Sequence, residues 1–348
     1  MRAATYTQGG EFLVKDVPKP VVPPGGLLLR ILATSICGTD IKIMKHGHRK
    51  LRDGQTITLG HEIVGEVVEL GEGVDGFQLG QRVGVAPNAG CGNCRTCRRG
   101  EANYCTEFTA FGIDRDGSHA EFMSVPPVFI RQGNLVPLPA EISNQAASLL
   151  EPLSCVVNGG RSVDLGKGDV VVIYGVGPMG LLHILAARAL GAEKVIAVDP
   201  QPERLVQAIK LGACLGIDPI KEDVKAQVME ASEGQGADVV ITACPVAAVQ
   251  NQALSLLATH GRLCLFGGLP KGAGAVPLDT NDIHYRHLTV TGTTGGSVAD
   301  YRAALDLVMS EGLDPLQVVS DTFSLQDLES AYAKALEGPM GKVVMVAT

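Results

Sequence analysis

The segment 169–190 constrains the fold of this chain more than any other part of the sequence. Its run Asp-Val-Val-Val-Ile-Tyr-Gly (169–175) predicts a buried strand, and 178–190 carries apolar residues at helical spacing. The turn between them has the pattern G-x-G-x-x-G, whose glycines let backbone N–H groups approach a pyrophosphate at the helix N-terminus. The pattern indicates a dinucleotide-binding turn, with an ordinary tight turn as the alternative. The candidate cofactor-binding residues in this turn are Gly175, Gly177, Pro178, Met179 and Gly180.

An acidic residue ends the next predicted strand, 194–199. Asp199 stands 19 residues after Gly180. A carboxylate at this place binds the adenosine ribose hydroxyls and repels a 2′-phosphate, so we expect NAD in preference to NADP. Arg204 complicates this expectation, because it could lie along the ribose or offset the charge of a phosphate.

Strand and helix patterns alternate through the middle of the chain. After a second helix pattern at 202–211, further strands are expected at 237–243 and 262–268, with a helix of about a dozen residues between them. This alternation predicts an α/β fold with a doubly wound parallel sheet. We expect a nucleotide-binding domain at 156–291, inserted into a domain made of 1–155 and 292–348.

The two ends of the chain read differently. Short strands are expected at 27–34, 62–70 and 81–87, which favours an irregular β-barrel. Beyond 292 we expect a helix at 297–310, a second helix opened by a Ser324–Asp327 capping box, and a last strand at 342–346.

Composition excludes several classes of protein. Hydrophobic residues make up 45% and charged residues 19% of the 348, which argues against disorder. The net charge of −8 argues against a general binder of nucleic acid or anionic membrane. The beginning of the chain has no apolar run after its arginine, so we expect no signal peptide and a cytoplasmic location.

Four of the nine cysteines are closely spaced, with the pattern C-x2-C-x2-C-x7-C. Four thiolates at this spacing can surround one Zn²⁺ tetrahedrally and leave no open position, as in structural zinc sites. An iron–sulfur cluster is the alternative, although the longer ferredoxin pattern is missing. The candidate structural zinc ligands are Cys91, Cys94, Cys97 and Cys105.

A second set of metal ligands is spread along the chain: Cys37 in CGTD, His61 and Glu62 in GHE, and Glu151 in EPLS. A thiolate, an imidazole and carboxylates together make a plausible catalytic zinc set with an exchangeable position. Alone, Cys37 could be a buried apolar residue and His61 a core histidine. Their joint presence beside a dinucleotide fold favours the metal site.

These motifs, in this order, resemble those of the zinc-dependent medium-chain dehydrogenases, which include alcohol and sorbitol-type polyol dehydrogenases. The resemblance covers essentially the whole chain. It implies a GroES-like barrel domain joined to a Rossmann domain, with the active site in the cleft between them. It also implies two zinc ions per chain, a small alcohol substrate, and a homodimer or homotetramer. From the net charge of −8 we expect no nucleic-acid or membrane partner. The apolar run 263–268 is our candidate for the sheet edge joining two subunits.

The resemblance also assigns roles to individual residues. Cys37, His61 and Glu62 match the catalytic zinc ligands of the polyol branch, and Glu151 matches an acid that binds the metal directly or through water. Thr39 falls at the proton-relay hydroxyl and Asp40 at the acid that orients the histidine. The residues that match the strand ends lining the nicotinamide are Phe266, Gly267, Gly268, Leu269, Thr291 and Thr293.

The expected reaction is hydride transfer from a secondary alcohol, first of all a sugar alcohol, to NAD. L-threonine dehydrogenases share CGTD and GHE but usually have aspartate before the proline, where this chain has Glu151, so they rank second. A sugar-alcohol phosphate is a further alternative, because a basic cluster runs from Lys42 to Arg52.

Two departures from the family pattern limit what the resemblance implies about the substrate. Lys42 replaces the usual relay histidine, and 293–296 lacks the arginine and aromatic of the polyol branch.

Two non-dehydrogenase alternatives stay open. One is a non-catalytic nucleotide-binding redox sensor, which would have no need of a metal with an open position. The other is a zinc-free quinone reductase of the same superfamily, which would lack both metal sets.

Overall fold

The computed structural model describes residues 1–270 and 272–347, and the chain divides into two compact units. The first unit comprises Met1–Ser154, Gly296–Leu305 and Val319–Thr348. The second comprises Cys155–Gly295 and Asp306–Val318. Two of the boundaries fall within helices, one in α5 (Leu150–Ser162) and one in α11 (Val298–Ser310).

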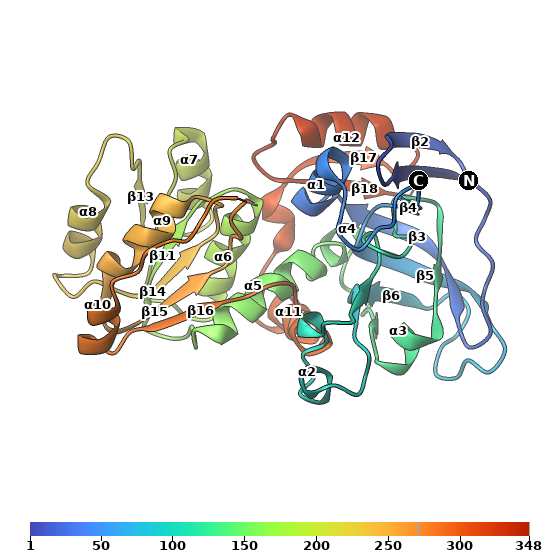
Figure 1. Cartoon of the computed structure of the whole chain (residues 1–348), viewed down its shortest axis with the longest axis horizontal. Helices are drawn as coiled ribbons and strands as arrows, with labels where there is room; N and C mark the ends of the chain where they lie inside the picture. The colour runs from blue at the N-terminus through green and yellow to red at the C-terminus, as the bar shows by residue number, and fades with distance from the viewer. Residues whose placement is uncertain (271, 348) are drawn as a thin grey trace. The chain divides into compact units, whose positions relative to one another are not determined.

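The second unit is built on a six-stranded, all-parallel sheet with helices along both of its faces (Figure 1). Its strand order, β13-β12-β11-β14-β15-β16, is that of the doubly wound nucleotide-binding fold. This order confirms the expected parallel sheet. The strands are β11 (Val170–Tyr174), β12 (Lys194–Val198), β13 (Leu215–Ile217), β14 (Ala237–Thr242), β15 (Leu257–Leu265) and β16 (Thr289–Gly292).

The helices of the second unit follow the strand–helix alternation of the sequence. The first begins at Pro178, directly after Gly177, because proline is favoured at the first position of a helix, where its missing N–H costs nothing. The helices are α6 (Pro178–Ala189), α7 (Pro202–Lys210), α8 (Val224–Ala231), α9 (Ala247–Gln252) with the 3₁₀ turn η2 (Ala253–Leu256), and α10 (Thr280–Tyr285). A further 3₁₀ turn, η3, covers Pro315–Val318.

Three details differ from the sequence expectations. The helix before β15 is shorter than a dozen residues, because α9 ends at Gln252 and tightens into η2. The run 263–268 is not a sheet edge, since β15 pairs with both β14 and β16, and β16 is the outer strand. Ser324 does not cap a helix. It ends β17, and Asp327 is itself the N-cap residue, accepting a hydrogen bond from the N–H of Ser330.

The first unit is rich in short antiparallel strands, as the sequence predicts. One sheet has the order β2-β1-β4, and a larger one has β10-β6-β5-β3-β18-β17 with β9 beside β3. A small pair, β7-β8, stands apart. The strands are β1 (Arg2–Thr7), β2 (Phe12–Asp16), β3 (Leu27–Ser35), β4 (Thr56–Thr58), β5 (Glu62–Leu70), β6 (Arg82–Val85), β7 (Asn88–Ala89), β8 (Thr109–Ala110), β9 (Phe122–Val125), β10 (Leu135–Pro137), β17 (Val319–Ser324) and β18 (Lys342–Val346).

Few helices accompany these strands, and β3, β5 and β18 do most to position the candidate site. Their apolar side chains belong to the buried core of the first unit, which also contains the stacked rings of Phe111 and Phe129, 4.1 Å apart. The helices are α1 (Gly38–His46), α2 (Arg95–Arg98), η1 (Ala102–Tyr104), α3 (Pro127–Arg131), α4 (Asn144–Ala147) and α12 (Leu328–Leu336). Within the described residues, no helix is long and apolar enough to pass through a lipid bilayer.

Candidate active site

Strand pairing in the first unit brings the CGTD and GHE motifs together. Strand β3 ends at Ser35 and pairs antiparallel with β5, so that Ser35 lies opposite Glu62. Cys37 follows β3 as the N-cap residue of α1, and His61 immediately precedes β5. As a result, one ligand atom each from Cys37, His61 and Glu62 lies within 4.8 Å of the others.

Asp40 joins the two segments that carry these ligands. Its side chain is fully buried, and one carboxylate oxygen accepts a hydrogen bond from the N–H of Cys37 at 2.8 Å. The other oxygen accepts from the N–H of Gly60 at 3.1 Å and lies 3.5 Å from Nδ1 of His61. A single carboxylate therefore fixes the backbone on both sides of the site.

Charges in this cluster strongly affect one another. Burial opposes the charged form of His61, but the nearby Asp40 carboxylate and Cys37 sulfur outweigh it and raise the pKa of His61 well above its ordinary value. Burial would likewise raise the pKa of Asp40, yet attraction to His61 holds this pKa well below its usual range. Asp40 and His61 thus each favour the charged form of the other, with Asp40 as the anion and His61 as the proton donor.

Glu62 is surrounded by hydrogen-bond donors. Its Oε2 accepts from the hydroxyl of Ser35, and its Oε1 lies 2.6 Å from Nζ of Lys342, the first residue of β18. Burial raises the pKa of Glu62 to about 7, because attraction to Lys342 offsets only part of the desolvation and the charge of Glu151 adds repulsion. Sequence reasoning missed both Ser35 and Lys342. A lysine at the start of a buried apolar strand was the available signal.

The remaining expected residues of this site lie on two helices. Thr39 is half-buried in the first turn of α1, whereas Lys42, one turn later, is exposed. Glu151 is buried in the first turn of α5 and outside the compact trio, although it is near enough for its charge to act on Glu62.

The donor set fits zinc. Sulfur, imidazole nitrogen and carboxylate oxygen are its ordinary ligands, and three protein ligands are typical of catalytic sites with an open position. Nδ1 of His61 has no hydrogen-bond partner among the described residues, and it faces Asp40, which leaves Nε2 available to a metal. Carboxylates that orient a metal-binding histidine in this way are common in zinc sites.

The four-cysteine loop forms a second compact cluster in the first unit. The sulfur atoms of Cys91, Cys94, Cys97 and Cys105 all lie within 4.8 Å of one another. Cys91 and Cys97 are 4.0 Å apart, and Cys94 and Cys105 are 3.8 Å apart. These separations exceed a disulfide bond but suit four thiolates around one tetrahedral ion, so this cluster also fits zinc.

The backbone of the glycine-rich turn in the second unit is closely packed. Gly175 has φ of 84°, a region that favours glycine, and it lies at the carboxyl end of β11. A Cβ atom on Gly180 would lie 2.0 Å from the carbonyl oxygen of Gly175, so no larger residue fits there. By contrast, a Cβ on Gly177 would meet only the Arg204 guanidinium, 3.7 Å away, within the described part of the chain. Gly177 thus leaves room for a phosphate beside a cation.

Asp199 lies at the carboxyl end of the neighbouring strand β12. Its two oxygens accept hydrogen bonds from the N–H groups of Val176 and Gln201, each at 2.9 Å. Arg204 approaches the same carboxylate at 3.7 Å, and its buried Nε lacks a hydrogen-bond partner in the described residues. Asp199 therefore joins the glycine-rich turn to the segment that follows β12. Arg204 is paired with Asp199 on one side, and its Nε is the part of the guanidinium left for an anionic ligand.

The residues expected near the nicotinamide follow the neighbouring strands β15 and β16. Cys264 in β15 lies opposite Thr291 in β16, and the sulfur of Cys264 is 3.8 Å from the hydroxyl oxygen of Thr293. Gly267 donates a hydrogen bond from its N–H to the carbonyl of Thr242, which draws the end of β15 against β14. Phe266, Gly267 and Thr293 thus lie at the carboxyl edge of the same sheet as the glycine-rich turn, where such folds bind nucleotides.

Comparisons with known proteins agree with this double arrangement. The family model described as alcohol dehydrogenase GroES-like domain matches residues 23–140, and that described as zinc-binding dehydrogenase matches 178–310. A relative named L-threonine 3-dehydrogenase, from Caldanaerobacter subterraneus subsp. tengcongensis, is 35% identical over 98% of this chain and 96% of its own length. The chain belongs to the zinc-dependent medium-chain dehydrogenase family.

Solved structures extend the likeness over the whole dehydrogenase. The alcohol dehydrogenase TADH from Thermus sp. ATN1 has a TM-score of 0.90 and 30% identity, with all of both chains covered. The 2R,3R-butanediol dehydrogenase from Bacillus subtilis has a TM-score of 0.88 and 30% identity, covering 100% of this chain and 99% of that one. These likenesses confirm the GroES-like and Rossmann-type fold and show that the chain is an oxidoreductase.

The basic cluster of this dehydrogenase is only partly available to a ligand. The ammonium group of Lys50 donates a hydrogen bond to the backbone carbonyl of Phe108 and lies 3.5 Å from the centroid of the Phe108 ring. It is also 3.7 Å from the carboxylate of Asp114. Lys50 therefore stabilises the packing of its own loop against the segment 108–114. The exposed members of the cluster are Lys42, Lys45, His46, Arg49 and Arg52.

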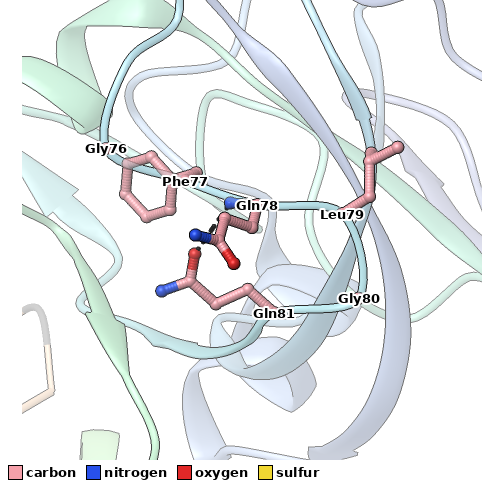
Figure 2. A pocket seen from close by; sticks show the side chains of 6 residues that line it. All are labelled: Gly76, Phe77, Gln78, Leu79, Gly80 and Gln81. Carbon is pink, nitrogen blue, oxygen red and sulfur yellow. Dashed lines mark hydrogen bonds between the residues drawn. The ribbon is translucent and has the colours of Figure 1, made fainter.

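An open hollow of about 560 Å³ lies over the loop 76–81 of the dehydrogenase's first unit (Figure 2). Phe77, Gln78, Leu79 and Gln81 line it together with two glycines, and the side-chain oxygen of Gln81 accepts a hydrogen bond from the N–H of Gln78 at 3.0 Å. None of these described lining residues is ionisable, so the hollow offers no acid, base or nucleophile for catalysis.

Proposed function

We propose that this dehydrogenase oxidises the secondary hydroxyl of L-threonine with NAD and a zinc ion held by Cys37, His61 and Glu62. The observation that carries the chemistry is the approach of these three ligand atoms to within 4.8 Å. The substrate is proposed from the relatives, because eight curated relatives that are 30–36% identical to this chain are all named L-threonine 3-dehydrogenase. They favour the amino-acid alternative over the sugar alcohol that the sequence motifs placed first.

Zinc in such a site lowers the pKa of an alcohol hydroxyl, and NAD accepts the hydride. The chain's own residues orient the reactants and move the proton. Asp40 keeps the His61 ring in place, and the half-buried hydroxyl of Thr39 takes the proton from the substrate hydroxyl and passes it outward. Lys42, which replaces the expected relay histidine, is exposed one turn further along α1. The proton therefore reaches solvent near Lys42 without a histidine relay.

Glu151 is proposed to act at the edge of this site and not as a permanent ligand. It lies outside the compact trio, and a third anionic ligand beside Cys37 and Glu62 would give the metal site a charge of −1 and close it. X-ray absorption with and without a substrate analogue tests this proposal. Four protein ligands in both states would refute it.

NAD is proposed as the cofactor because Asp199 directly follows β12, the strand beside the glycine-rich turn, where we expect a ligand of the adenosine ribose. A negative charge there disfavours the 2′-phosphate of NADP, and the Arg204 guanidinium, 3.7 Å away, is already paired with it. The strand-end residues Phe266–Leu269, Thr291 and Thr293 are proposed to line the nicotinamide.

A second zinc ion is proposed in the four-cysteine cluster, where it stabilises the loop and takes no part in turnover. We also propose that the chain is a cytoplasmic homodimer or homotetramer, and that 156–291 is the nucleotide-binding domain within a zinc-binding domain made of 1–155 and 292–348. Size-exclusion chromatography with light scattering tests the assembly.

A substrate screen tests the proposed reaction. Initial rates of NADH formation are measured with L-threonine, L-allo-threonine, 2R,3R-butanediol, sorbitol and sorbitol 6-phosphate, each with NAD and with NADP. We expect kcat/KM to be highest for L-threonine with NAD, by about tenfold or more over the others. A polyol preferred over L-threonine would overturn the substrate proposal, and zinc-loaded protein that oxidises none of these alcohols would overturn the reaction.

2R,3R-Butanediol is the second candidate substrate, because a solved structure with 30% sequence identity to this chain is named 2R,3R-butanediol dehydrogenase. The diol shares the secondary hydroxyl of L-threonine but lacks its ammonium and carboxylate groups. Equal kcat/KM for the two substrates would therefore mean that the site does not recognise the amino-acid charges.

A further inference from the structure

Three strands of the first unit meet at the Glu62 carboxylate. In the central strand β3, Ser35 lies opposite Glu62 of β5 on one side and opposite Val344 of β18 on the other. Lys342, two residues before Val344, extends its ammonium group to Oε1 of Glu62 at 2.6 Å and to the carbonyl oxygen of Ile36 at 3.1 Å. Residues far apart in sequence thus form one hydrogen-bonded group beside the proposed metal ligands.

The Glu62–Lys342 ion pair is buried, with exposed fractions of 0% for Glu62 and 4% for Lys342. Removing two charges from water carries a large desolvation cost, and the attraction between them often fails to exceed that cost. A well-packed pair of apolar residues at these two positions would stabilise the fold equally well. Lys342 is therefore better explained by its effect on the charge and the hydrogen bonding of the Glu62 carboxylate.

Both oxygens of Glu62 already accept a hydrogen bond, one from Lys342 and one from the hydroxyl of Ser35. A metal ion would therefore have to share this carboxylate with two donors.

Lys342 also changes the total charge of the metal site. A Zn²⁺ ion with the Cys37 thiolate and the Glu62 carboxylate is neutral, and Glu151 nearby makes the group negative. The ammonium of Lys342 offsets that charge, and a metal that is less anionic polarises an alcohol more strongly.

We propose that Lys342 is a positioning residue that competes with the metal for the Glu62 carboxylate and so weakens Glu62 as a ligand. This inference rests on the proposed function, in which Glu62 contacts the metal. A weakly held carboxylate leaves the metal able to accept the substrate oxygen, whereas a tightly held one closes the site.

Replacing the lysine by a neutral residue tests this role through metal affinity. Zinc and cobalt affinities of the full chain are measured by chelator competition, and the metal lost in Cys37→Ser identifies the site concerned. In Lys342→Met we expect affinity at this site to rise by about tenfold or more, because a buried carboxylate loses its competing cation and becomes dependent on the metal. The visible absorption of the cobalt-loaded protein should change with it, and kcat should fall.

Lys342→Arg keeps the charge and should restore the affinity and the cobalt spectrum of the unchanged protein. Lys342→Gln keeps a donor but removes the charge, and it serves if the methionine variant does not fold; its affinity should rise as well. Lys334→Met, which removes a lysine from the same end of the chain on α12, is the matched control and should leave affinity unchanged.

Unchanged or weaker metal binding in the neutral variants would overturn the proposal, because a merely orienting or structural lysine gives that result. The affinity is measured without substrate or cofactor. Failure of L-threonine oxidation and failure of this inference are therefore separate outcomes.

Discussion

A carboxylate oxygen of Asp40 lies 3.5 Å from Nδ1 of His61, and the same side chain accepts hydrogen bonds from the backbone of both ligand-bearing segments. The approach of the Cys37 and His61 segments therefore depends on one buried acid. The amide of Asn has one acceptor oxygen and an NH2 group, which cannot accept from the second backbone N–H.

Asp40→Asn should therefore destabilise the first unit by about 1–3 kcal/mol and weaken zinc binding at the Cys37 site by roughly 10–100-fold. Urea unfolding and chelator competition measure the two effects. Asp53→Asn, at an exposed loop position, is the control. Zinc affinity equal to that of the unchanged protein would show that Asp40 does not organise the site.

Cys37→Ala should abolish turnover without preventing cofactor binding. The substitution removes one of three metal ligands in the first unit, whereas the glycine-rich turn and Asp199 belong to the second. NADH fluorescence titration should give a dissociation constant within about threefold of the unchanged protein, with one zinc lost per chain. Cys214→Ser, at an exposed cysteine, should keep both activity and metal. Residual turnover with full zinc content would contradict the assignment.

Asp199→Asn should shift cofactor preference toward NADP. The neutral side chain removes the repulsion of a 2′-phosphate and frees the Arg204 guanidinium, 3.7 Å away, to bind it. We expect the ratio of kcat/KM for NADP to that for NAD to rise by about tenfold or more, the scale of one charged hydrogen bond. Glu203→Gln, on the exposed surface of α7, should not change the ratio. An unaltered ratio in Asp199→Asn would show that this carboxylate does not set the preference.

His183 makes the second unit sensitive to acid. Burial lowers the pKa of His183 to about 3, and the ring packs edge-on against Phe266 with centroids 4.5 Å apart. Below the unfolded pKa of 6.5 the unfolded chain takes up a proton that the folded chain refuses, so stability is present above pH 6.5 and is lost as the pH falls toward 3.

The loss from this one group amounts to about 1.4 kcal/mol for each pH unit between these limits. His183→Leu should remove this contribution, so the difference in unfolding free energy between variant and parent should change with that slope between pH 6 and 4, as followed by urea unfolding. His287→Asn, at an exposed histidine of the same unit, should keep the parent's acid sensitivity. Parallel pH profiles for His183→Leu and the parent would contradict the burial argument.

Local sequence determined much of the fold. The strands 62–70 and 342–346 form as predicted, because apolar and β-branched residues in a short run favour a buried strand wherever it pairs. The turn 175–180 was equally predictable, since Gly180 leaves no space for a side chain and the packing is local. The motifs around Cys37 and His61 identified the candidate ligands for the same reason: each ligand lies within a few residues of its own signature.

Tertiary pairing decided the rest. The 263–268 run looked like an outer strand, yet β16 covers it, because sheet order is set by long-range contacts. The sequence around Lys342 does not indicate which residue this lysine contacts. Only the pairing of β18 with β3, and of β3 with β5, brings Lys342 to Glu62. A residue's own neighbours determine whether it forms a strand or a turn, but the charge it meets when buried depends on which distant strand the fold places beside it.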